Sequence, residues 1–435
     1  MKITCTASDF INIIEPACYV ASKAMLKTNP FNDLITIKTE DNKINLLSFN
    51  GMMSLNTNIE NVKLENDNME VEGVGKITIS STNLLKNIKS FRDEEELIIE
   101  LYSENDQKDL RISKKEDLEE FQSLPCYSTD ISTPDYARVD IAKELEVHRE
   151  TFVAGANRVN FAQGDEKSGE LAKFSYWLLR FAGSKMRFAA GDNRRFPILD
   201  VNGDGIFKTK AKTANIMFPK EQSAILLKLL SSSKCNTFKI KESKKTSLYY
   251  QLFEFDNHSL IISHVDPNIQ WPDESKILNK DIKTKFVVSA EDWAVVAKAV
   301  DAAFDGEEID NNKSEVVTLK TEFKENLLHI EVNETHRISR KVSFLDYWSE
   351  TGEDLEFKVF ALYLKEIFNK GEKQGKYQFD FGEVIENANG DKTVGPFFVR
   401  YYADEKVQDK KEIKLLDNGT GWQYQFLFII LPTMK

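Results

Sequence analysis

The stretch Ile3–Phe10 (ITCTASDF) carries a pattern that occurs three times in the 435-residue chain. A strand-like run is followed by an alanine, an acid and a large apolar residue, which is typical of the start of a helix. We identify the same pattern at Val139–Leu145 (VDIAKEL) and at Phe286–Trp293 (FVVSAEDW). The alanines of successive copies are 135 and 148 positions apart. Because solenoid repeats are only about 20–50 residues long, this spacing indicates a whole domain present in three copies.

A second pattern, a strand followed by a helix with an apolar face, is also repeated. Its copies are Ile77–Ile88, Ile216–Leu230 and Phe357–Phe368. The last strand residues of successive copies are 139 and 141 positions apart. A strand followed by a helix is common in proteins, but two such patterns in step across three copies favour repetition over coincidence.

The repeats divide the chain into three predicted domains, at residues 1–130, 136–278 and 283–435. Polar, turn-forming residues separate them, Ser128–Asp135 before the second domain and Leu278–Asp281 before the third. Each domain is expected to contain two helices among more numerous strands. The predicted fold class is therefore α+β, with three similar domains.

The composition excludes several classes of protein. Hydrophobic residues make up 41% and charged residues 29% of the chain, which is typical of a globular protein. No apolar run reaches the roughly 18–20 residues of a membrane helix, and no secretory leader is recognised. The net charge of −12 argues against a basic exterior covered with nucleic acid but allows positive charge on one inner surface. The cysteines form no CxxC pair, so we expect a cytoplasmic protein without disulfides or zinc.

No motif in the sequence predicts an enzyme. Asp200–Gly205 (DVNGDG) matches the first half of a calcium-binding loop, but Ala211 occupies the twelfth position, where the loop requires glutamate. The five histidines are scattered, and phosphate-loop, dinucleotide and nucleophile-elbow motifs are missing from the sequence. We therefore predict no catalytic residues, no metal site and no cofactor.

Basic residues occur on all six expected helices. Lys86, Lys89 and Arg92 recur at three-residue steps and share one helix face. A solvated surface explains any one such position, but their presence on every helix of an acidic protein favours a positive surface that faces a polyanion. Such a surface contacts phosphates without sequence preference. The residues assigned to it are Lys23, Lys86, Lys89, Arg92, Arg149, Arg158, Lys220, Lys228, Lys298 and Lys365.

Further stretches resemble the bacterial sliding clamps, the beta subunits of DNA polymerase III. Ala189–Arg195 (AAGDNRR) is similar to the family's ATDGHRL segment, and Trp271–Asp273 (WPD) to its FPD turn. Ile429–Lys435 (IILPTMK) is similar to the closing VVMPMRL, and Asp354–Val359 (DLEFKV) to the family's EMEIGF. Pro16 also has a near counterpart in the first helix. Together with the threefold repeat, the resemblance covers nearly the whole chain.

The resemblance implies a processivity factor without catalytic activity. It implies domains with antiparallel sheets and a head-to-tail homodimer that closes a ring of six similar domains. Helices would line the hole, and the ring would encircle double-stranded DNA without sequence preference. The implied partners are DNA polymerase and the clamp loader, which bind through short linear motifs. The alternatives are a clamp-like scaffold that binds proteins but does not encircle DNA, and an enzyme built on a repeated α+β domain.

The family's partner site is a hydrophobic cleft between the middle and last domains. Phe196 and Ile198 would line one wall, although these two residues could instead alternate into the domain core. Carried over by position, the cleft would comprise Ala190, Asp192, Asn193, Arg194, Arg195, Phe196, Ile198, Pro272, Lys276, Ile277, Ile430, Leu431, Pro432, Thr433 and Met434.

This chain departs from the family's pattern within the cleft segments. The family's Asp-Gly pair is reversed at Gly191–Asp192, and asparagine replaces its histidine at Asn193. Arginine replaces a leucine at Arg195, and threonine replaces a methionine at Thr433. Glu274–Ser275 stands where the family has tyrosine and arginine. We therefore expect a different peptide preference.

The dimer contacts are inferred from the same resemblance. Phe121–Leu124 (FQSL) is similar to the family's FPNL, which places Leu110 and Ile112 on its interface strand. Phe304, at the end of a helix in the third domain, would face them from the other subunit.

Overall fold

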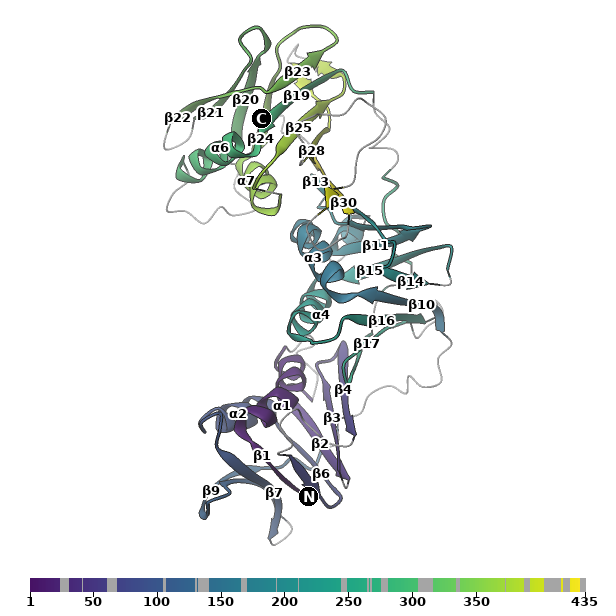
Figure 1. Cartoon of the computed structure of the whole chain (residues 1–435), viewed down its shortest axis with the longest axis vertical. Helices are drawn as coiled ribbons and strands as arrows, with labels where there is room; N and C mark the ends of the chain where they lie inside the picture. The colour runs from purple at the N-terminus through teal and green to yellow at the C-terminus, as the bar shows by residue number, and fades with distance from the viewer. Residues whose placement is uncertain are drawn as a thin grey trace. The chain divides into compact units, whose positions relative to one another are not determined.

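Figure 1 shows a computed structural model of the chain. The structure describes residues 1–23, 31–40, 42–60, 69–104, 107–129, 131, 141–165, 170–192, 194–209, 211–243, 249–263, 266, 268–274, 281–303, 316–333, 337–371, 373–386, 392–402, 416–417 and 423–430.

The chain forms two compact units. The N-terminal unit comprises Met1–Val153, Phe207–Ala211 and Glu221–Asn268, and the C-terminal unit comprises Ala154–Ile206, Lys212–Lys220 and Ile269–Lys435. Residues 136–278, predicted to form the middle domain, contribute to both units. The boundaries of the three domains therefore stay a prediction.

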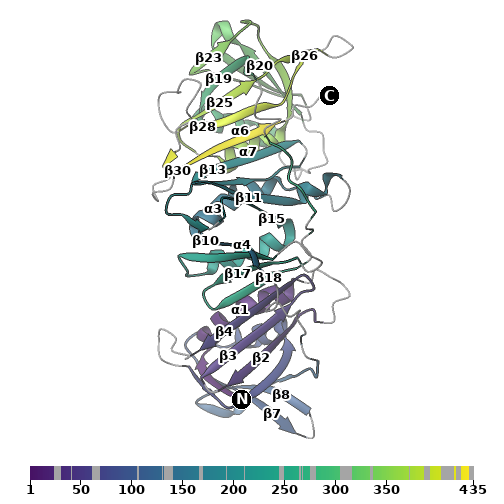
Figure 2. The same cartoon turned by 90° about the vertical axis from the view of Figure 1, so that its right-hand side faces the viewer.

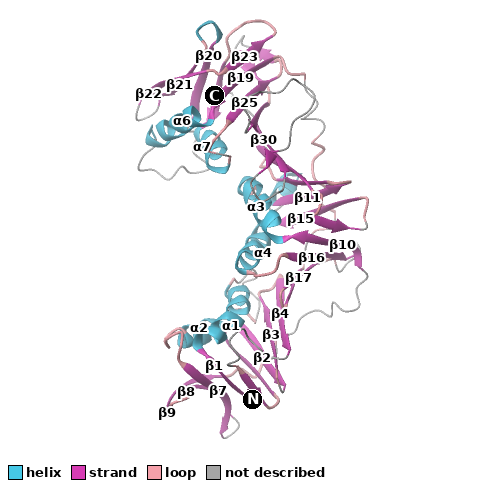
Figure 3. Cartoon of the chain, viewed as in Figure 1, coloured by secondary structure: helices cyan, strands magenta, loops and turns pink. Residues whose placement is uncertain are grey.

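The N-terminal unit contains two antiparallel sheets. The five-stranded sheet has the order β5 (Glu70–Glu72), β1 (Lys2–Thr6), β7 (Glu96–Glu104), β8 (Gln107–Lys114) and β9 (Asp117–Pro125). The nine-stranded sheet has the order β14 (Phe207–Thr209), β10 (Ile141–His148), β16 (Thr237–Ser243), β17 (Gln251–Phe255), β18 (His258–Ile262), β4 (Met53–Glu60), β3 (Lys43–Phe49), β2 (Leu34–Glu40) and β6 (Gly75–Ser80). The helices α1 (Ala7–Ser22) and α2 (Ser81–Ile88) pack against each other beside these strands (Figure 3).

The pairing of β18 with β4 joins strands that the sequence assigns to different domains. His258 lies opposite Thr57 in this antiparallel ladder. Their side chains also meet, with Nδ1 of His258 and Oγ1 of Thr57 2.8 Å apart. One hydrogen-bonded sheet therefore extends from the first repeat into the second.

The C-terminal unit also contains a large antiparallel sheet, of ten strands. Its order is β15 (Thr213–Pro219), β11 (Tyr176–Ala182), β12 (Lys185–Ala189), β13 (Arg195–Asn202), β30 (Gln423–Ile430), β28 (Phe397–Tyr402), β25 (Lys376–Phe381), β19 (Thr284–Ser289) and β23 (Asp346–Ser349), with β29 (Leu416–Asp417) paired to β30. Figure 2 shows β13, β30 and β28 side by side. Strands that are far apart in the sequence therefore share one sheet.

The smaller elements of the C-terminal unit complete it. A four-stranded sheet has the order β22 (Arg337–Ser343), β21 (Leu327–Asn333), β20 (Val316–Glu322) and β24 (Glu356–Phe360), and β26 (Val384–Glu386) pairs with β27 (Lys392–Val394). The helices α6 (Ala290–Ala303) and α7 (Ala361–Lys370) pack against each other. The short 3-10 helices are η2 (Asn160–Ala162), η3 (Glu170–Ser175) and η4 (Phe323–Glu325).

Two further helices have residues in both units, α3 (Arg149–Val159) and α4 (Lys220–Ser232). The described residues thus contain six α-helices among antiparallel sheets, which confirms the predicted α+β class. None of the helices in these residues is long and apolar enough to cross a membrane.

The second sequence pattern is confirmed at all three positions. The helices α2, α4 and α7 follow directly after the strands β6, β15 and β24. They begin at Ser81, Lys220 and Ala361, which are 139 and 141 positions apart. Their apolar faces are buried, as the pattern requires.

The first pattern is confirmed in two copies and wrong in the second. Ala142 does not begin a helix but lies in strand β10, where Leu145 and Val147 alternate into the core. The helix of the second copy is α3, which begins seven residues later, at Arg149. The helices α1, α3 and α6 therefore begin 142 and 141 positions apart, which agrees with the spacing of the second pattern.

Helix capping explains why the first pattern is correct at α1 and α6 and wrong at Ala142. The hydroxyl of Thr6 accepts a hydrogen bond from the Asp9 backbone N–H at 3.1 Å, and it donates to the Asp9 carboxylate. Ser289 and Asp292 form the same pair at the start of α6. Such reciprocal pairs fix the first turn of a helix. The start of α3 has Thr151 where these helices have aspartate, so its sequence carries no matching signal.

Candidate functional site

The antiparallel pairing of β13 with β30 brings two of the proposed cleft segments together. Phe196 lies opposite Ile429, and Ile198 lies opposite Leu427. Their side chains belong to one buried apolar cluster, against which three half-buried side chains also pack. The buried members are Phe174, Leu178, Ala189, Phe196, Ile198, Phe398, Leu427 and Ile429, and the half-buried ones are Met217, Trp271 and Ile282.

The turn Trp271–Pro272 lies against this cluster. The ring centroids of Trp271 and Phe196 are 5.4 Å apart, and Phe196 makes an edge-on contact with Phe174 at 5.8 Å. Both Trp271 and Pro272 keep part of their surface exposed. Phe196 and Ile198 are buried beneath, which agrees with the alternative that they alternate into a core. The half-exposed aromatic surface at this site is therefore that of Trp271.

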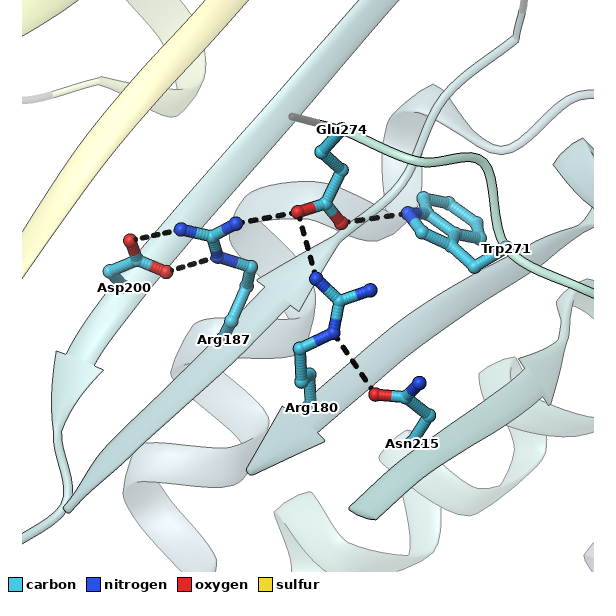
Figure 4. Close-up of polar contacts among 6 residues, drawn as sticks. All are labelled: Arg180, Arg187, Asp200, Asn215, Trp271 and Glu274. Carbon is cyan, nitrogen blue, oxygen red and sulfur yellow. Dashed lines mark hydrogen bonds and ion pairs between the residues drawn. The ribbon is translucent and has the colours of Figure 1, made fainter. Parts of the chain in front are cut away.

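A buried ion network holds the turn on the sheet (Figure 4). The Glu274 side chain is only 2% exposed. Its carboxylate accepts hydrogen bonds from Arg187 at 2.5 Å, from Arg180 at 3.1 Å and from the Trp271 indole N–H at 2.9 Å. Because three donors from two strands and the turn itself converge on one carboxylate, the turn is fixed at a single position.

The two arginines belong to a polar row that crosses four neighbouring strands. Arg180 on β11 lies between two cross-strand neighbours, Asn215 on β15 and Arg187 on β12. Arg187 in turn lies opposite Asp200 on β13. Both oxygens of Asp200 accept hydrogen bonds from Arg187, at 2.6 and 2.7 Å, and these bonds raise the pKa of the guanidinium above its ordinary value. The row carries two positive and two negative side chains once Glu274 is included, so its charges balance.

Arg195 points to the opposite face of β13 from Phe196, because neighbouring residues of a strand alternate. Its guanidinium, 6% exposed, forms ion pairs with Asp192 at 2.8 Å and with Glu366 of α7. It also lies over the rings of Tyr363 and Phe161. Burial lowers the pKa of Arg195, but the two carboxylates outweigh burial and raise it. Burial raises the pKa of Tyr363 to about 12.

The comparisons with known proteins agree on the fold. The chain is similar over 100% of its length to the sliding clamp of Bacillus subtilis, with 99% of that chain covered, 15% identity and a TM-score of 0.74. It is also similar to the Helicobacter pylori beta clamp in complex with carprofen, with 17% identity and a TM-score of 0.72, and to the Pseudomonas aeruginosa DNA polymerase III subunit beta, with 14% identity and a TM-score of 0.72. In both comparisons 100% of each chain is covered. The chain has the fold of the bacterial sliding clamps. No protein-family model and no curated protein matches the sequence.

The proposed cleft residues of this clamp fold differ in their exposure. Ala190, Ile430 and Arg195 are buried, Pro272 and Asp192 are half-buried, and Arg194 is exposed with its guanidinium over the Phe360 ring. Arg195, which the resemblance places in the cleft, is committed to Asp192 and Glu366, so its charge is not available to a peptide. The remaining cleft residues, Asn193, Lys276, Ile277, Leu431, Pro432, Thr433 and Met434, lie outside the described residues.

Most of the proposed DNA-facing side chains of this clamp fold are exposed. These are Lys23, Lys86, Lys89, Arg92, Lys228 and Lys298. Arg158, Lys220 and Lys365 are half-buried, and the Lys220 ammonium group donates to the carbonyl of Gln163 and to Asp165. The Arg149 guanidinium donates to the carbonyls of Leu230 and Cys235. Since these bonds hold it at the end of α4, we remove Arg149 from the proposed DNA surface.

The proposed dimer contacts need a similar correction. Leu110 and Ile112 are fully buried in β8, where they alternate into the core of the five-stranded sheet. They therefore cannot form a subunit interface without unfolding of the sheet. The edge strand next to β8 is β9, on which Leu118 is 59% and Phe121 48% exposed, and β5 forms the other edge of the sheet. Phe304 lies outside the described residues.

The sequence indicates the Trp271–Asp273 turn but not the network beneath it. Glu274 stands out in the sequence only as a departure from the family's pattern, and Arg180 and Arg187 do not stand out at all. Their one signal is the placement of arginine within strands whose other residues are largely apolar. Among the described residues, no group of three or more histidine, cysteine, aspartate or glutamate side chains is placed to hold a metal ion.

Proposed function

We propose that this protein is a DNA sliding clamp, a processivity factor that performs no catalysis itself. The observation that carries the proposal is the similarity to solved sliding clamps over the full length of both chains. The near-equal spacing of the helices, which divides the chain into three similar parts, supports it independently. In this proposal two copies form a ring of six domains, with boundaries near residues 1–130, 136–278 and 283–435.

The ring would encircle double-stranded DNA and hold it by topology. Exposed lysines on the helices or at their ends, together with Arg92 beyond the end of α2, would face the phosphates. Such contacts are independent of sequence. The chain as a whole is acidic, with a net charge of −12, which would discourage DNA from binding to other surfaces. This combination suits a protein that must slide along the duplex without gripping it.

The partners would be DNA polymerase and the clamp loader, bound through short linear peptides. We place the peptide site at the half-exposed turn Trp271–Pro272, and we include the exposed Arg194 in it on the strength of the sequence resemblance. Aromatic side chains and arginine are common anchors of such interfaces. The cleft residues that lie outside the described part of the chain belong to this proposal on the strength of the sequence resemblance. We expect the protein to work in the cytoplasm.

The homodimer would place the exposed edge β9 at the subunit boundary. An edge strand with free backbone groups and exposed apolar side chains requires a partner to avoid nonspecific association. The partner strand from the second copy, and the role predicted for Phe304, stay predictions.

Retention on circular DNA tests the proposal most directly. The purified protein, together with a clamp loader and ATP, is incubated with a nicked circular plasmid and separated by gel filtration. Light scattering should give twice the 49.9 kDa chain mass. A clamp should stay with the circle in high salt and leave within minutes of linearisation, because its hold is topological. Equal retention on circular and linear DNA would contradict encirclement and favour a protein-binding scaffold.

A further inference from the structure

Glu274 does more than neutralise two arginines, because it also fixes the orientation of Trp271. One of its carboxylate oxygens, Oε2, accepts from Arg180 and Arg187, and the other, Oε1, accepts from the indole N–H of Trp271 (Figure 4). The ring of Trp271 in turn rests on Phe196. Trp271 is thus held at two points, by Glu274 at its indole N–H and by Phe196 in a tilted ring contact.

The construction of the network is unusual for a surface turn. Surface turns are ordinarily solvated, whereas this one is held by a carboxylate that is 2% exposed and by arginines that come from two neighbouring strands. A buried ion network is costly to assemble and is weak evidence of a gain in stability. What it produces here is a half-exposed tryptophan with a single orientation. Rigid, partly exposed tryptophans are frequent hot spots of binding interfaces.

We propose that Glu274 is a positioning residue of the peptide site, which holds Trp271 as the aromatic anchor for a large apolar side chain of the partner peptide. This inference rests on the proposed function, since it assumes that the partner is a short peptide. In it, Glu274 does not touch the peptide. It acts through Trp271, whose orientation it sets before the peptide arrives, so that binding orders fewer groups.

The first test needs no peptide. Acrylamide quenching of tryptophan fluorescence is measured for the wild type and for Glu274→Gln, each with and without the additional change Trp271→Phe. The difference within each pair gives the contribution of Trp271. Glu274→Gln keeps the size of the side chain but removes its charge. We expect Trp271 to become clearly more accessible to the quencher in Glu274→Gln. Unchanged quenching would overturn the inference, because Glu274 would then not position the indole.

The second test measures peptide affinity in a double-mutant cycle. Peptides are selected on the full-length protein from a phage-displayed random library, and their dissociation constants are measured by fluorescence anisotropy. We expect Glu274→Gln to weaken binding about tenfold in the wild-type background and less than about twofold in the Trp271→Phe background. Equal losses in both backgrounds would overturn a role that acts through Trp271.

A matched control separates positioning from general loss of stability. Glu242 is equally buried, at 2% exposed, and pairs with Lys143 in the N-terminal unit. Glu242→Gln should lower the melting temperature without changing peptide affinity. If Glu242→Gln weakens peptide binding as much as Glu274→Gln does, the affinity merely follows the stability of the protein and the inference fails. If the selection yields no peptide for the wild type, the peptide site itself fails, whereas retention on circular DNA still decides encirclement.

Discussion

The ion pair between Arg195 and Glu366 allows a prediction whose size follows from burial. Arg195 is 6% and Glu366 15% exposed, and Asp192 lies 2.8 Å from the same guanidinium. We consider three variants: Arg195→Leu, Glu366→Leu and the two changes combined. Each single change removes one member of the Arg195–Glu366 pair and leaves the charge of the other in a mostly buried place. The combined change removes both charges and leaves two leucines beside the rings of Phe161 and Tyr363.

The magnitudes follow from the cost of an unpaired buried charge. Loss of one member of a buried pair costs about 3–5 kcal/mol when the other is left uncompensated. In Glu366→Leu the Asp192 carboxylate still neutralises Arg195, so we expect a smaller loss, about 2–3 kcal/mol. We expect a similar loss for Arg195→Leu, because the two carboxylates that remain are partly exposed. In the double variant Asp192 also loses Arg195, but this carboxylate is 19% exposed and still accepts hydrogen bonds from the backbone N–H groups of residues 194 and 195. Since replacement of a buried pair by apolar residues is often neutral, the double variant should lie within about 1 kcal/mol of the wild type.

Thermal unfolding followed by calorimetry measures these differences. A change of 1 kcal/mol shifts the melting temperature of a 150–250-residue unit by about 2–4 °C, so each single variant should melt about 4–12 °C lower. The double variant should recover most of that loss, which corresponds to a coupling energy of about 3 kcal/mol or more. If the double variant is destabilised by the sum of the two single losses, Arg195 and Glu366 do not act as a pair and the reasoning is wrong.

Three further predictions concern other parts of the chain. Gly191→Ala should weaken peptide binding measured by anisotropy, because an added Cβ would lie 2.4 Å from the Phe196 ring and displace it. Burial lowers the pKa of His258 below 6.5, although the nearby Asp256 acts in the opposite direction. The imidazole therefore takes up a proton more readily in the unfolded chain than in the folded one. The N-terminal unit should therefore lose stability as the pH falls from 6.5 toward the folded pKa, and His258→Gln should remove this dependence in melting curves recorded from pH 7.5 to 5. In DNA binding measured from 50 to 200 mM salt, Lys228→Ala should reduce the slope of log K against log salt by about 0.9 for each phosphate that the variant no longer neutralises. The exposed Lys239, which lies on a strand, should leave that slope unchanged when it is replaced by alanine.

The fold was largely predictable from the sequence because both repeated patterns are local. An apolar helix face directly after a strand needs no distant partner to be recognised, and all three such helices lie where the pattern predicts them. The error at Ala142 arose where a local signal was missing. Asp9 and Asp292 close the first turn of their helices, whereas the helix that begins at Arg149 carries no equivalent acid at that position. Composition alone could not distinguish an alternating strand from the start of that helix.

The site was less predictable because its contacts join distant residues. Glu274 binds arginines that are 87 and 94 positions away in the sequence, and no local pattern connects them. The buried state of Leu110 and Ile112 likewise depends on which strand forms the sheet edge, and that follows from pairing between strands. Resemblance placed the Trp271–Asp273 turn near the correct strand, but only the sheet register shows what holds it there.

The positions at which this chain departs from the clamp pattern have a common structural consequence. Arg195 replaces a leucine and is bound between Asp192 and α7, and Glu274 replaces a tyrosine and is bound between two strands. Both introduce a charge into a mostly buried place, and both charges are compensated there. Neither is free to contact a ligand, so these departures change how the site is held. The turn still presents part of an aromatic ring and of a proline, at Trp271 and Pro272, next to the exposed Asp273. If the proposed function holds, we expect the partner peptide to keep an apolar anchor and to differ from the peptides of the bacterial sliding clamps in the residues around it.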